Sequence, residues 1–222
     1  MNAEEKEEKF IAACSLLLQH DEAREGDIKY QTKLDAEHQK ALYYMKEARG
    51  ERARRALTPL IEFSLHNKRV WLRQSALNRI EDMVCAEPAL ITPKFMLAMF
   101  QIVNDNNPNH FRDSVGYSGE RLREEMRQVH AIAFRIINAS VGKSAEATTV
   151  IYVEAGLNAY LSQFPDYAKV DPQTRLGKNV NAALALKARV ENIKNDMQER
   201  ACLRPASSQA PLSADLPSQR PA

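Results

Sequence analysis

The chain has 222 residues and a mass of 25.1 kDa, enough for one elongated helical unit or a compact domain with appendages, but not for two large independent domains. Its 31 basic and 29 acidic residues give a formal net charge of +2, so bulk charge does not indicate nucleic acid or an anionic membrane as the partner. Seven glycines are few for a β-sandwich, and no apolar run is long enough to cross a bilayer.

Eight successive segments carry apolar residues at the spacing of one helical face, which predicts an all-α fold of about eight helices. The first two helices are expected over residues 3–19 and 27–49, and residues 1–50 form an N-terminal pair that closes one end of a stack. The third, over 51–65, contains Pro59, which removes an amide donor and bends a helix. The fourth follows Lys68 and stops before Pro88.

The fifth helix begins at Pro93, with Thr92 as its N-cap, because a threonine oxygen accepts orphan amides and a first-turn proline has none to satisfy. A polar loop leads from Asp105 to Gly119. The last three helices are expected over residues 118–142, 144–164 and from 171 onward. Residues 51–142 then form the helical core, and residues 143–202 form a C-terminal helical pair.

Residues 203–222 are rich in proline, serine and alanine and contain few large apolar side chains. Proline blocks helix formation, and such a composition cannot bury enough apolar surface to fold. We expect a disordered C-terminal tail.

Residues 56–114 resemble HEAT repeats, in which a proline-kinked first helix is paired with a second helix. The first unit is carried by Leu57, Pro59, Leu60 and Ile61, then Leu72, Arg73, Ser75, Ala76 and Ile80; the next by Ile91, Pro93, Ile102 and Val103, then Asp105, Pro108, Phe111 and Arg112. Arg73 and Arg112 are 39 positions apart (112 − 73), near the roughly 40 of a HEAT period.

The resemblance implies a short right-handed α-solenoid, or an irregular helical bundle where the pattern breaks after Arg112. In such proteins the second helices line an extended surface that binds peptides, helices or nucleic-acid backbones. The resemblance carries no catalytic residues. It also places Arg73 and Arg112 at the start of second helices, where a guanidinium bridges neighbouring repeats, and we expect them to serve in stacking and not in ligand contact.

The sequence contains no motif that indicates a catalytic or cofactor-binding site. The five histidines are not at metal-ligand spacing, and no serine lies in a GxSxG turn. The cysteines, Cys14, Cys85 and Cys202, are odd in number and far apart, which argues against a disulfide framework or a CxxC metal site. We expect a protein that is not an enzyme and has no cofactor.

The expected location of the protein in the cell is inferred from its N-terminal residues. The N-terminus alternates Glu and Lys and does not resemble a secretory signal peptide, so a cytoplasmic location is expected. Translocation by a specialised secretion route stays open.

The densest basic cluster lies near the third and fourth helices, where Trp71 is also found. A salt-bridged solvent face is one interpretation, and contact with a phosphate or an acidic partner is the other. Trp71 either packs in the core or anchors an interface. The candidate partner-binding residues are Arg49, Arg52, Arg54, Arg55, Lys68, Arg69 and Trp71.

The expected function is that of a protein–protein interaction scaffold or adaptor, including the case of a secreted or translocated regulatory protein. The alternative is a helical-repeat protein that binds nucleic acid through the basic edge between Arg49 and Arg73. A steep loss of affinity with added salt would separate the second from the first.

Overall fold

The computed structural model describes residues 3–19, 28–46, 48–111, 119–141 and 147–202. Within these ranges the regular structure is helical and contains no β-strand. The prediction of an all-α fold with about eight helices is therefore confirmed. The expected tail at 203–222, the loop at 112–118 and Arg112 lie outside the described residues. The helices are α1 (Ala3–Leu17), α2 (Ile28–Tyr44), α3 (Glu51–His66), α4 (Val70–Ala86), α5 (Pro93–Asn104), α6 (Glu120–Val141), α7 (Ala147–Ser162) and α8 (Arg175–Cys202).

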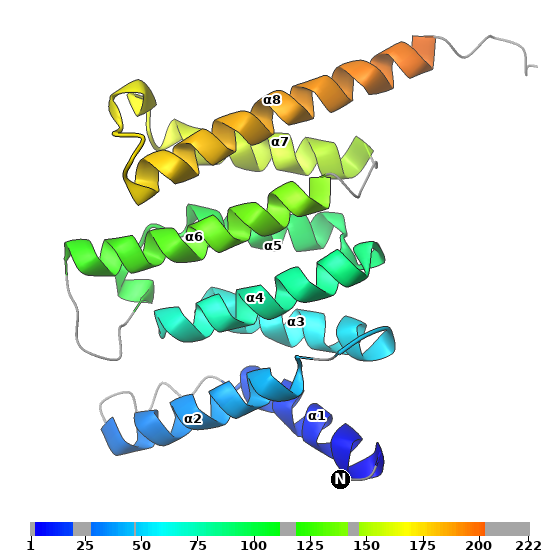
Figure 1. The fold of residues 1–222 in the computed structure, drawn as a ribbon, viewed down its shortest axis with the longest axis vertical. Coiled ribbons are helices and arrows are strands. Elements are labelled where there is room, and N and C mark those ends of the chain that lie inside the picture. Colours follow the sequence, from blue (N-terminus) through cyan, green and yellow to red (C-terminus); the bar gives the residue numbers. More distant parts are fainter. Residues whose placement is uncertain (1–2, 20–27, 47, 112–118, 142–146, 203–222) are drawn as a thin grey trace, which may run out of the picture.

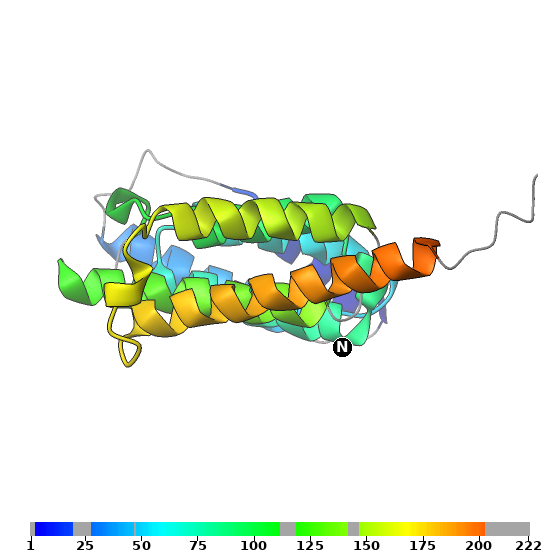
Figure 2. The ribbon, with the colours of Figure 1, turned by 90° about the horizontal axis from the view of Figure 1, so that it is seen from above.

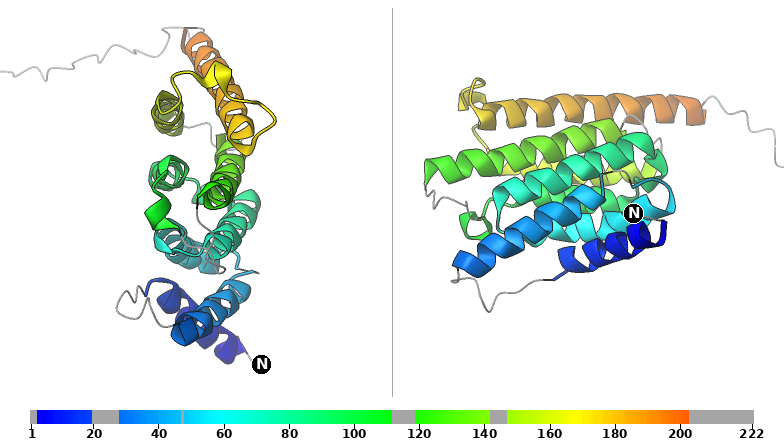
Figure 3. Two further views of the ribbon diagram at one scale, coloured as in Figure 1. Left: turned by 90° about the vertical axis from the view of Figure 1, so that its left-hand side faces the viewer. Right: turned by 60° about the horizontal axis from the view of Figure 1, so that its bottom comes forward.

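Consecutive helices form four pairs that stack one above the other, with α1–α2 at one end and α7–α8 at the other (Figure 1). The odd-numbered helices lie side by side and form the first layer, and the even-numbered helices form the second layer. Each helix packs on its partner in the pair and on the helices of its own layer in the adjacent pairs. Figures 2 and 3 show the two layers from above and from the side.

A continuous hydrophobic core fills the space between the two layers. It begins with Phe10 in α1 and continues through to Val190 in α8. The most deeply buried side chains include Leu60, Ile80 and Met96, which come from three successive helices. Because every pair buries its apolar faces against the next pair, the stack depends on contacts between neighbours. None of the described helices has both the length and the apolar character needed to cross a membrane.

The start of α5 agrees with the sequence prediction. The Thr92 hydroxyl accepts a hydrogen bond from the Phe95 amide at 3.2 Å, and Pro93 occupies the first turn. Pro59 lies inside α3 and is buried, and the helix continues past it to His66. The cap residue and the first-turn proline thus set the start of α5, as the sequence predicted.

The start of α8 differs from the prediction at Asp171. The helix begins at Arg175, because Asp171 accepts a hydrogen bond from the Gln173 amide and forms a turn. Thr174 is then the residue that caps the helix, and its hydroxyl accepts the Gly177 amide at 3.0 Å. The turn folds back so closely that a Cβ on Gly177 would lie 2.1 Å from the Asp171 carbonyl oxygen.

A second close approach joins α5 to α7. Gly156 of α7 faces the buried ring of Phe100, and a Cβ at this position would lie 2.2 Å from Phe100 Cγ. The missing side chain therefore sets how near these two first-layer helices can lie. Glycine costs a helix interior about 1 kcal/mol relative to alanine, so packing outweighs helix propensity here.

We predict that Gly156→Ala lowers the free energy of unfolding by about 1 to 3 kcal/mol, although the same change in an open helix would raise it. Urea denaturation followed by circular dichroism measures this. The double variant Gly156→Ala with Phe100→Leu should recover part of the loss, because the smaller side chain makes room for the methyl group. A stabilised single variant would contradict the close packing of α5 on α7.

Candidate binding surface

Two of the candidate basic residues form ion pairs with α1. Arg52 and Arg55 lie in the first turns of α3, and their guanidinium groups are each 2.7 Å from a different carboxylate oxygen of Glu7. Both guanidinium groups also lie over the ring of Phe10. The two arginines lower the pKa of Glu7 through these hydrogen bonds and keep it ionised. They therefore join the first pair to the second.

Three further basic residues contact other parts of the chain. Arg54 is 3.4 Å from the carboxylate of Glu87, which follows the end of α4, and Arg69 is 3.1 Å from Asp35 in α2. Arg49 is exposed and donates a hydrogen bond to the carbonyl of Ala48.

The structure does not bring the candidate basic residues together as one edge. Arg52, Arg54 and Arg55 lie at the start of α3, next to the end of α4. Lys68 and Arg69 lie at the opposite end of the same pair, about 24 Å away along a helix of 16 residues. The separation arises because the two groups lie at opposite ends of α3. Trp71, half-buried, packs against the core from the first turn of α4.

Arg73, by contrast, is almost fully enclosed, with only 1% of its surface exposed. Its guanidinium donates hydrogen bonds to the carbonyl of Asn67, just after α3, and to that of Leu65 in the last turn of α3, the latter at 2.6 Å. It also reaches into the next pair, where Asp105 Oδ2 lies 3.3 Å away and the His110 carbonyl 3.4 Å away. Burial lowers the pKa of Arg73, and the carboxylate of Asp105 opposes that effect.

The Arg73 guanidinium also stacks 4.2 Å from the ring centroid of Phe111. Phe111 follows a short 3-10 turn, Pro108–His110, and is extended and buried. The expected equivalence of this position with the start of a second helix is wrong, because α6 begins at Glu120, 50 positions after Val70 (120 − 70). Before Phe111 the chain forms the 3-10 turn instead, in which the Asn107 side chain accepts a hydrogen bond from the Asn109 amide at 3.0 Å.

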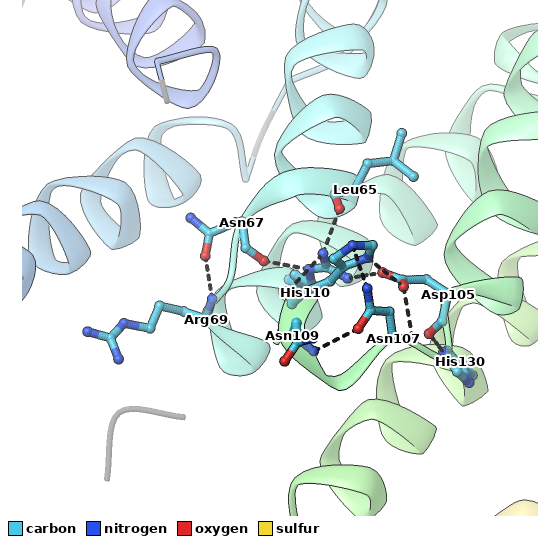
Figure 4. Close-up of polar contacts among 9 residues, drawn as sticks. Leu65, Asn67, Arg69, Asp105, Asn107, Asn109, His110 and His130 are labelled. Atoms are coloured by element: carbon cyan, nitrogen blue, oxygen red, sulfur yellow. Dashed lines mark hydrogen bonds and ion pairs between the residues drawn. The ribbon is translucent and has the colours of Figure 1, made fainter. Parts of the chain in front are cut away.

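Asp105 is the acceptor that organises this junction (Figure 4). One carboxylate oxygen contacts Arg73, and the other lies 2.8 Å from Nδ1 of His110. The other ring nitrogen of His110 lies 3.0 Å from the Asn107 side-chain amide. Both nitrogens of His110 are therefore engaged, although the ring is half exposed. An imidazole held on both sides is suited to fixing a turn and poorly suited to acting as a free base.

His130 in α6 completes the junction from inside the stack. It is 2% exposed, and its Nε2 lies 3.1 Å from the Asp105 carbonyl oxygen (Figure 4). Burial lowers the pKa of His130 to about 4, despite the favourable contact with Asp105. The ring is therefore neutral at physiological pH, and its N–H donates to the carbonyl.

Among the described residues, no group of three or more His, Cys, Asp or Glu side chains is arranged to hold a metal ion. The polar residues that do converge, around Arg73 and Asp105, have partners within the protein. Their geometry supports a structural junction between the second and third pairs.

The first layer carries an exposed surface without charge on α5 and α7. Leu97 is 49% exposed, Ile151 62% and Tyr152 43%, which are high values for large apolar side chains. The only charged residues of these two helices are Lys94, in the first turn of α5, and Glu154, which binds Lys194 of α8. We define the neutral surface by its exposed, uncharged members: Leu97, Gln101, Thr148, Ile151, Tyr152, Ala155 and Ala159.

The α5 part and the α7 part of the neutral surface lie next to each other, at the same height along the two helices. Gly156 contacts Phe100, and α5 and α7 run parallel because α6 lies between them in the chain. Leu97 lies one turn before Phe100, and Tyr152 one turn before Gly156, so each is on the side of its helix that adjoins the contact. Sequence reasoning missed this surface, because α7 is apolar around most of its circumference and no stripe marks its outer side.

Comparison of the chain with protein-family models, curated proteins and solved structures gave no match.

We predict that Arg73→Ala lowers the free energy of unfolding by about 3 kcal/mol, because it leaves Asp105 and two carbonyls without their donor. Arg73→Lys should recover less than half of the loss, since one ammonium cannot replace a planar array of donors. Urea denaturation measures both. Arg123→Ala is the matched control: Arg123 is exposed, pairs with Glu120 in its own helix, and should cost less than about 0.5 kcal/mol.

We predict that stability falls as the pH is lowered from about 6.5 to 4. In this window the unfolded state takes up a proton on His130 and the folded state does not, because the folded pKa is about 4. The loss contributed by His130 approaches 1.4 kcal/mol per pH unit within the window and is absent above it. His130→Gln should flatten the profile. A His130→Gln variant that keeps the native slope between pH 6.5 and 4 would contradict this assignment.

Proposed function

We propose that this chain is a HEAT-like helical scaffold that binds another protein through the neutral surface. The observation that carries the proposal is the exposure of Leu97, Ile151 and Tyr152 on two adjacent helices. Contiguous apolar surface of this kind on a folded protein marks an interaction site more often than chance exposure does. The partner is expected to offer an apolar helix or loop, because α5 and α7 present almost no charge for an ionic partner.

Several features support a HEAT-like repeat. The stack consists of antiparallel pairs, proline lies inside the first helix α3, and Arg73 lies in the first turn of the second helix α4. Arg73 connects one pair to the next, as the resemblance implies for this position. A solenoid presents a long open surface and does not enclose a deep pocket, which suits binding better than catalysis.

The second layer is less suited to an apolar partner. Arg135 of α6 pairs with Glu81 of α4, and Arg175 of α8 pairs with Glu124 of α6. These contacts cross the layer and keep it charged. Four of the candidate basic residues likewise have carboxylate partners within the chain, which makes nucleic-acid binding the less favoured alternative: Arg52, Arg54, Arg55 and Arg69.

We expect the protein to act in the cytoplasm, where thiols stay reduced. In the described part of the chain, neither Cys14 nor Cys85 forms a disulfide.

The test uses the immobilised full chain in a quantitative capture experiment with lysate. We predict that a specific protein is retained by the native chain and lost, at least tenfold, with Leu97→Glu and Tyr152→Glu together. The matched control, Ala36→Glu with Gln39→Glu, adds the same charges at exposed positions of α2 and should retain it. Retention should change little between 50 and 300 mM salt, because apolar contacts are not screened.

Two outcomes would contradict the proposal. Capture that survives the paired substitution in α5 and α7 would exclude the neutral surface as the site. Capture that is abolished by nuclease, or that falls steeply with salt, would favour nucleic-acid binding by the basic residues. Circular dichroism of each variant checks that the fold is retained.

A further inference from the structure

The junction between the first pair, α1–α2, and the second pair, α3–α4, separates charge by sign. Among the described residues, the carboxylates that form ion pairs across it, Glu7 and Asp35, both belong to the first pair. Their partners, Arg52, Arg55 and Arg69, lie in α3 or directly before α4. The first pair, at the end of the stack opposite α8 (Figure 1), therefore covers basic positions of the second pair with acidic ones.

The contact between α1 and α3 has a specific geometry. Glu7 and Phe10 are three positions apart and lie on one side of α1. One carboxylate oxygen of Glu7 is 2.7 Å from Arg55, and the other is 2.7 Å from Arg52. The two guanidinium groups lie 5.7 and 5.5 Å from the centroid of the Phe10 ring, which is 2% exposed. This geometry fits a helix that carries an acidic residue and, three positions later, an aromatic one.

A second ion pair lies near the other end of α3. Asp35 and Arg69 are 3.1 Å apart, and their side chains are only 16% and 19% exposed. Burial raises the pKa of Asp35, and Arg69 opposes this effect only in part. A pair of this kind contributes little net stability, because the desolvation of both charges offsets most of their attraction.

Apolar packing contributes less to the first pair than to α5. In the described residues of the first pair and the turn after it, four buried apolar side chains are larger than alanine: Phe10, Leu17, Leu42 and Met45. Helix α5 alone buries six such side chains. Since the free energy of burial scales with apolar area, charge carries a larger share of the contacts of the first pair.

The connection from the first pair to the second is short and contains a position that requires glycine. Only six residues, 45–50, separate α2 from α3. Gly50 has φ +56° and ψ −129°, a conformation that other residues disfavour, although a Cβ there would meet nothing within 4 Å. Its amide donates a hydrogen bond to Glu87 of the second pair. A glycine at the end of a short connection is suited to absorb the backbone change of a hinge.

We propose that the first pair is a hinged acidic cover, whose opening at Gly50 frees Arg52 and Arg55 for a helix of another protein with the same acidic and aromatic residues. In the closed state α1 occupies this site, and the partner helix replaces it. The proposal is independent of the neutral surface, which lies on α5 and α7.

Hydrogen–deuterium exchange of the full chain, measured by mass spectrometry, tests the opening. Glu7→Lys places a third positive charge beside two arginines and should speed exchange in α1 and α2 by about tenfold or more, with native rates in α5 and α6. Adding Arg52→Glu and Arg55→Glu restores opposite charges and should return the rates toward native. The matched control Glu81→Lys reverses a charge between α4 and α6 and should leave α1 and α2 unchanged.

Fluorescence anisotropy tests the site, with a labelled peptide of residues 3–19 as the probe. The peptide should bind the Glu7→Lys chain at least about tenfold more tightly than the native chain, whose own α1 competes for the site. A peptide with Phe10→Ala should lose this binding, because it lacks the ring that lies under the guanidinium groups.

Four results would overturn the proposal. The first is native exchange in α1 and α2 of the Glu7→Lys chain, and the second is faster exchange throughout the stack, since the first pair would then not open by itself. The third is equal or absent binding of the native and Phe10→Ala peptides by the Glu7→Lys chain. The fourth is tighter binding of a single-stranded oligonucleotide than of the peptide, which would assign the two arginines to nucleic acid.

Discussion

The buried guanidinium of Arg73 is the interaction on which the order of the stack depends most. Its side chain contacts two carbonyls at the end of α3, and in the following pair it contacts the carboxylate of Asp105 and the ring of Phe111. A buried charge is tolerated only where its donors are satisfied, so the two turns must keep a fixed separation. The register between the second and third pairs follows from that requirement.

The junction around Asp105 shows why a polar cluster need not be a catalytic site. It contains an aspartate, two histidines and an arginine, a combination that invites a catalytic interpretation. Each group nevertheless already interacts with other groups of the protein: both ring nitrogens of His110 have partners, and His130 is buried and neutral. Chemistry of the usual acid–base kind needs a group that can exchange its proton with a substrate, and this cluster offers no open position. Its physical role is to hold backbone turns that could not otherwise satisfy their carbonyls.

The surfaces left over by this architecture are of two different kinds. On the first layer, α5 and α7 approach closely through Gly156 and Phe100, and the side chains beside the contact remain exposed and uncharged. On the second layer, arginine–carboxylate pairs join successive helices and leave a polar face. The proposed binding of an apolar partner therefore uses the first layer, while the second layer stays hydrated.

The sequence by itself determined the helices, because apolar spacing, proline and cap residues such as Thr92 act locally. The resemblance to HEAT repeats also implied a stacking role for Arg73, and this side chain does contact the next pair. The tertiary structure alone decided the partners of Arg52, Arg55 and Arg69, which find carboxylates in helices distant along the chain. It also decided that Phe111 lies under Arg73 in a loop, and that Leu97 and Tyr152 share one surface. Pairing across helices depends on which faces pack together, and a pattern read along one helix does not contain that information.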